Sequence, residues 1–69
     1  MDTQLFELFA GRPDRDPLWL ETIRGREEAQ TKLQRHATAK PGPYFIFSTA
    51  TYNVVAKIDT TPRAAAGGR

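Results

Sequence analysis

The chain has 69 residues and no cysteine, which limits it to a single domain and excludes disulfide bonds and thiolate metal sites. Its formal net charge is +2, but residues 1–60 carry eight basic and eight acidic side chains, and the excess comes from Arg63 and Arg69. A strongly basic surface is therefore not predicted. The sequence contains no stretch of about 20 apolar residues and no signal-peptide pattern at its start. We therefore expect a cytoplasmic protein, and its brevity suggests a bacterial one.

The first third of the chain has the pattern of a β-hairpin. Residues 4–10 form an apolar run with one charge, which favours a strand. Residues 11–17 contain two prolines, one glycine and two aspartates, a composition typical of a turn. Residues 18–23 are again rich in aromatic and branched side chains and predict a second strand.

Residues 26–39 predict a helix, because they are mostly good helix formers and contain neither proline nor glycine. Glu27 and Glu28 lie in the first turn, where the helix dipole favours negative charge. Ala29, Leu33 and Ala37 recur every four residues and form a narrow apolar stripe, with His36 at its margin. One such helix covers one face of a sheet and no more.

The rest of the chain predicts a second hairpin. Residues 44–49 follow Pro41-Gly42-Pro43 and form the most apolar run, which we expect in the interior of the sheet, whereas residues 54–58 alternate like a half-buried strand. The expected fold is α+β, with the order ββαββ and a four-stranded, mainly antiparallel sheet that carries one helix on one face. We expect this domain to span residues 1–60 and the low-complexity residues 61–69 to be a disordered tail.

The strands are apolar on both sides, although a sheet with one wet face should alternate apolar and polar residues. We expect Phe45 and Phe47 to face the helix and Tyr44 and Ile46 to face the other way. The helix-free face then exposes an apolar surface larger than a monomer usually tolerates, so a homodimer or another protein partner is expected. The alternative to a partner is that a loop, the tail or the twist of the sheet covers this face. The predicted interface residues are Phe9, Trp19, Ile23, Tyr44, Ile46 and Val55.

An exposed aromatic sheet also suggests a second function, the binding of single-stranded nucleic acid, in which bases stack on the rings and basic groups hold the phosphates. This reading requires Arg12, Arg15, Arg24 and Arg26 to gather at one edge of the sheet. The neutral charge of residues 1–60, and the acids Glu7 and Glu21 on the predicted strands, argue against it.

We expect no catalytic, cofactor or metal site. Nucleophilic catalysis needs a nucleophile, a base and an orienting group, and the chain has one histidine, His36, and one serine, Ser48. Asp14 and Asp16 form an Asp-x-Asp pair, but without further oxygen ligands at a suitable spacing they are better explained as turn residues.

Four segments together resemble small uncharacterised bacterial proteins of similar length. They are Phe6-Glu7-Leu8-Phe9, Trp19-Leu20-Glu21, the run from Pro41 to Ser48, and Ala56-Lys57-Ile58-Asp59. The resemblance covers residues 4–59. It implies a self-contained domain and does not imply any activity.

Overall fold

The structure, a computed structural model, describes residues 4–62. Its elements follow the order β1 (Leu5–Ala10), β2 (Leu18–Arg24), α1 (Arg26–Ala39), β3 (Pro43–Ser48) and β4 (Asn53–Asp59). The predicted α+β fold with the order ββαββ is therefore confirmed. Within residues 4–62 no helix is long and apolar enough to cross a membrane.

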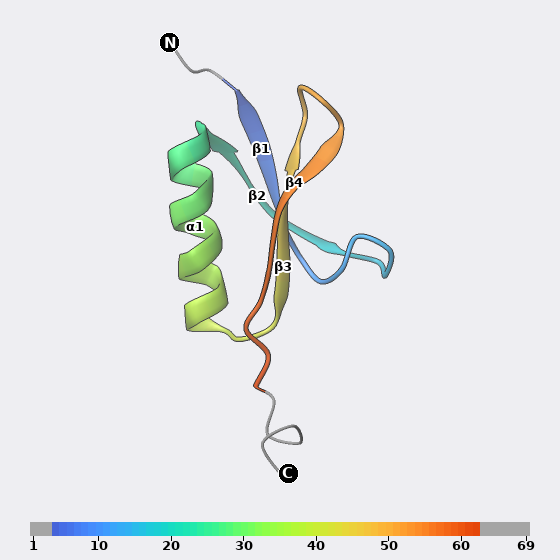
Figure 1. Cartoon of the computed structure of the whole chain (residues 1–69), viewed down its shortest axis with the longest axis vertical. Helices are drawn as coiled ribbons and strands as arrows, with labels where there is room; N and C mark the ends of the chain where they lie inside the picture. Colours follow the sequence, from blue (N-terminus) through green and yellow to red (C-terminus); the bar gives the residue numbers. More distant parts are fainter. Residues whose placement is uncertain (1–3, 63–69) are drawn as a thin grey trace.

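The four strands form one antiparallel sheet with the spatial order β2-β1-β3-β4. The two hairpins thus meet through their first strands, β1 and β3, which occupy the interior, while β2 and β4 form the edges. Helix α1 lies along one side of this strongly twisted sheet, and the β1–β2 loop projects away from the helix (Figure 1). The expected interior position of the third strand is confirmed.

Helix α1 begins and ends where the local sequence requires it. Gly25 precedes it with φ 93°, a left-handed conformation that glycine adopts without steric cost, and its N–H donates to the Gln4 carbonyl at 2.9 Å. The Lys40 N–H closes the last turn on the His36 carbonyl at 3.0 Å, and Pro41 then prevents continuation. As predicted, the buried residues of the helix are Ala29, Leu33 and Ala37.

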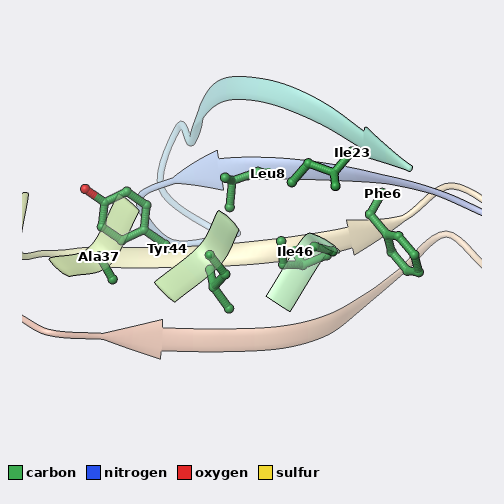
Figure 2. Packing of buried hydrophobic residues seen from close by; sticks show 8 residues of the cluster. Phe6, Leu8, Ile23, Ala37, Tyr44 and Ile46 are labelled. Carbon is green, nitrogen blue, oxygen red and sulfur yellow. The ribbon is translucent and has the colours of Figure 1, made fainter. Parts of the chain in front are cut away.

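The hydrophobic core lies between α1 and the sheet, and it corrects our assignment of the faces of β3. Tyr44 and Ile46 are buried beneath the helix together with Phe6, Leu8 and Ile23 (Figure 2). Phe45 and Phe47 therefore point to the opposite, helix-free side, because successive side chains of a strand alternate. The expectation that Phe45 and Phe47 face the helix was wrong. Both alternate sets on β3 are apolar, so its pattern contains no signal that distinguishes them.

Two β-bulges change the faces on the edge strands. On β2 the pairing shifts between Leu8 and Phe9, so that Phe9 faces Trp19 while Leu8 faces Glu21. The extra residue places Trp19 on the helix-free side and Glu21 and Ile23 on the helix side, although strict alternation would keep all three together. On β4 a second shift leaves Val55 without a partner between Val54 and Ala56.

The chain after β4 is attached to the end of the helix through Thr60. The Thr60 hydroxyl donates to the Ala37 carbonyl at 2.8 Å and accepts from the Gly42 N–H at 3.0 Å. The Thr60 N–H also donates to the Gly42 carbonyl at 3.0 Å. Of the predicted tail, residues 63–69 lie outside the described residues.

Candidate interaction surface

We call the helix-free side of the sheet the open face. The strand register places the following residues on it: Leu5, Glu7, Phe9, Trp19, Thr22, Arg24, Phe45, Phe47, Val54, Lys57 and Asp59. Tyr52, in the β3–β4 turn, adds its ring beside Phe47 at a centroid distance of 6.0 Å. No second layer of secondary structure within residues 4–62 covers this face.

An aromatic row crosses the centre of the open face from β2 to β3. Phe9 pairs with Trp19 on one side and with Phe45 on the other, and the Phe9 and Phe45 rings stack at 4.9 Å with an interplanar angle of 6°. Phe45 is only 4% exposed, whereas Trp19 is 55% and Tyr52 77% exposed. The β3 end of the row is thus packed within the chain, whereas Trp19 at its β2 end presents a large apolar surface to solvent, as does Tyr52 beside the row.

Glu7 is the acid within this apolar surface. Its Oε1 accepts hydrogen bonds from Trp19 Nε1 at 2.6 Å and from Thr22 Oγ1 at 2.9 Å, and its cross-strand neighbour on β3 is Phe47. These bonds fix both the carboxylate and the indole ring. An indole N–H needs such a partner when its ring is to lie in an apolar interface.

The other charges of the open face lie at its margins. Arg12 reaches from the β1–β2 loop to Asp59 on β4, with Nη2 and Oδ2 3.1 Å apart. Lys57 lies beside Phe45 on β4 and, with residues 12–15, lines a hollow of about 650 Å³. Residues of the loop, including Gly11, Arg12 and Pro13, also line a hollow over Phe45. The loop therefore lies beside Phe45 at the margin of the open face.

Only part of the predicted interface lies on the open face. Phe9 and Trp19 do, but Ile23, Tyr44 and Ile46 are buried in the core. Val55 is half exposed and lines a hollow on the helix side with Phe6 and Ala29. The assignments of Ile23, Tyr44 and Ile46 were wrong, because they depended on uninterrupted alternation and on the inverted face of β3. Val55 is exposed as expected, but the bulge in β4 removes it from the open face.

The four arginines proposed for nucleic-acid binding do not gather at one edge. Arg12 and Arg15 lie in the loop after β1, whereas Arg24 pairs with Leu5 at the opposite end of the β1–β2 hairpin and Arg26 begins the helix. The Phe9 and Phe45 rings already stack on each other, so Phe45 offers no free face to a base.

Ser48 and His36, the one serine and the one histidine of the chain, lie apart. Ser48 is buried beside Phe6 at one end of β3, and the His36 ring lies 6.3 Å from the Tyr44 ring, four residues away along the strand. His36 Nε2 instead donates to Glu21 Oε2 at 2.8 Å. In residues 4–62 no three histidine or acidic side chains are grouped as metal ligands would be.

Glu21 links the edge strand to the helix. Its second oxygen lies 3.7 Å from Lys32 Nζ. The hydrogen bond from His36, assisted by the positive charge of Lys32, lowers the pKa of the Glu21 carboxyl against the opposing effect of its partial burial. This acid therefore belongs to the helix–sheet contact and does not lie on the aromatic face of its strand.

Sequence reasoning missed Phe45, Phe47, Val54 and Tyr52 as members of the open face. Phe45 and Phe47 were missed because both sides of β3 are apolar. Val54 was missed because no residue pattern located the bulge in β4. Comparison of the chain with protein-family models, curated proteins and solved structures gives no match, so the function must be argued from this surface itself.

Proposed function

We propose that this domain is a non-enzymatic interaction module that associates with a second copy of itself through the open face. The observation that carries the proposal is the position of Trp19, half exposed at the end of the aromatic row with its indole N–H already bonded to Glu7. A partner that covers Trp19 removes a large apolar area from water, and the indole N–H keeps its hydrogen bond to Glu7 when it is buried.

The size of the open face predicts the strength of association. Four strands at a spacing of about 4.8 Å, each with about six residues that rise about 3.3 Å, give a footprint of roughly 400 Å². Two copies then bury roughly 800 Å² or more once the side chains that project from the sheet are included, which is below the roughly 1,200–2,000 Å² of stable specific interfaces and in the range of weak, transient ones. We therefore expect micromolar affinity. Such a protein exchanges between monomer and dimer.

Single-stranded nucleic-acid binding is less well supported. The arginines are divided between the two ends of the hairpin, and Arg12 is engaged by Asp59. Around the aromatic row the acids balance the bases, so the electrostatic attraction that dominates such binding is weak.

The test is sedimentation equilibrium of the purified chain from micromolar to millimolar concentration, with Trp19→Ala compared with wild type. Interface tryptophans are frequently hot spots worth about 2 kcal/mol or more, so we expect the dimer Kd to rise at least tenfold. Leu18→Ala is the matched control, because Leu18 is the exposed neighbour of Trp19 but pairs with Ala10 on the other side of the sheet. A wild-type chain that remains monomeric at millimolar concentration contradicts the proposal, as does an equal effect of Leu18→Ala.

A further inference from the structure

We infer that the two subunits are joined by reciprocal ion pairs between Glu7 of one subunit and Lys57 of the partner subunit. The two-fold axis then crosses β3 between Phe45 and Phe47. This inference rests on the proposed self-association and specifies its geometry. Its starting point is the carboxylate of Glu7, which lies among aromatic side chains in the surface that would be covered.

Glu7 determines what the partner must supply. Oε1 accepts from Trp19 and Thr22, and no ion pair joins Glu7 to a basic side chain of residues 4–62. Removal of a carboxylate from water is costly unless a cation meets it in good geometry. An occupant of the open face must therefore place a positive group beside Oε2, which carries no hydrogen bond from these residues.

Two-fold symmetry restricts the source of that cation to the open face itself, because the same patch contributes from both subunits. The strand register places two basic residues on this face, Arg24 and Lys57, and Arg12 reaches its margin from the β1–β2 loop. Arg12 is held by Asp59 at 3.1 Å, and Arg24 lies at the far end of the sheet beside Leu5. Lys57 has no ion-pair partner among the described residues and is exposed.

The strand register decides between Lys57 and Arg24. Glu7 on β1 faces Phe47, and Lys57 on β4 faces Phe45. Since β3 lies between β1 and β4, the midpoint between Glu7 and Lys57 falls on β3, between the two phenylalanines. A two-fold axis that runs parallel to the sheet over that point, perpendicular to the line from Glu7 to Lys57, brings the aromatic centres of both copies together and forms the ion pair twice.

An axis midway between Glu7 and Arg24 has a different consequence. That midpoint lies between β1 and β2 towards the end of the hairpin. The contact would then be centred near the β2 edge of the sheet and would leave Val54 and Tyr52, which are 37% and 77% exposed, uncovered on the β4 side. The pairing with Lys57 therefore buries more of the apolar surface with the same number of ion pairs.

A charge-reversal cycle tests the assignment. Glu7→Lys and Lys57→Glu are each expected to weaken the dimer at least tenfold in sedimentation equilibrium, since each places like charges opposite one another. The double variant is expected to recover most of the wild-type affinity. Arg35→Glu is the control, because Arg35 lies on the exposed side of α1 and its reversal should leave the Kd within about twofold.

Folding is verified for each variant by circular dichroism, because Glu7→Lys also removes the acceptor for Trp19 and Thr22. If Glu7→Lys does not fold, Glu7→Gln and Lys57→Gln replace the reversals. We expect both to weaken the dimer and to reduce the rise of the wild-type Kd with added salt, because an ion pair is screened by salt.

The outcomes separate this inference from the proposal on which it rests. A monomeric wild type overturns both. A wild-type dimer that tolerates both single changes, or a double variant that fails to recover, overturns the ion pair alone. Recovery by Glu7→Lys with Arg24→Glu, and not with Lys57→Glu, also overturns it, because the axis would then lie between β1 and β2.

Discussion

Thr60 provides a direct test of where the folded domain ends. Its hydroxyl bridges the Ala37 carbonyl, one of the last in α1, and the Gly42 N–H that precedes β3. Thr60→Val keeps the shape of the side chain and removes both hydrogen bonds. Because a typical hydrogen bond contributes about 0.5–1.5 kcal/mol net, and the half-buried site admits some water, we expect the free energy of unfolding to fall by about 1–2 kcal/mol.

The assay is urea unfolding followed by far-UV circular dichroism, with all variants at one protein concentration because association also stabilises the folded state. In a thermal scan each kcal/mol should lower Tm by about 4–8 °C for a domain of this size. Thr60→Ser is the matched control, since it retains the hydroxyl and should recover most of the loss. If Thr60→Val stays within about 0.5 kcal/mol of wild type, as ordinary surface changes do, the link between Thr60 and the helix end is not a stabilising one.

Two further predictions concern the helix side of the sheet. Tyr44→Phe removes the hydrogen bond of 2.5 Å from the Tyr44 hydroxyl to the Lys40 carbonyl. It should lower the free energy of unfolding by about 1 kcal/mol and leave the dimer Kd unchanged, because Tyr44 lies beneath α1; a change in Kd measured by sedimentation would contradict this placement. Because the pKa of Glu21 is lowered in the folded state, its contribution to stability is present above its unfolded pKa and is lost as the pH falls through its folded pKa. Glu21→Gln should therefore be less stable than wild type at pH 7 by up to about 1 kcal/mol, as for an exposed ion pair. In urea unfolding this difference should disappear as the Glu21 carboxyl becomes protonated, and a difference that does not change with pH would refute the pairing.

The fold could be predicted from local chemistry. Two prolines and a glycine between residues 11 and 17 separate the first two strands, and Gly25 and Pro41 bound the helix. The stripe of Ala29, Leu33 and Ala37 identified the buried side of α1. These features depend on residues close together in the chain, which is why a single sequence contains them.

The candidate surface could be predicted only in part. The sequence predicts one helix and strands that are apolar on both sides. One side of the sheet must therefore lack a second layer. Phe9 and Trp19 were placed on that side correctly. The assignment of Tyr44 and Ile46 to it was wrong, because a strand with large apolar side chains on both sides packs against a helix equally well in either orientation.

The amino-acid sequence by itself determined the order of the elements, the neutral charge of the domain and the excess of apolar side chains over what one helix can cover. Only the tertiary structure decided which side chains the helix covers. The bulge in β2 turns Trp19 away from Ile23, and the register of β1, β3 and β4 places Glu7 and Lys57 on either side of Phe45 and Phe47. The physical reason is that a shift of one residue in pairing exchanges the two faces of a strand, and the strands that set this pairing are distant in the sequence.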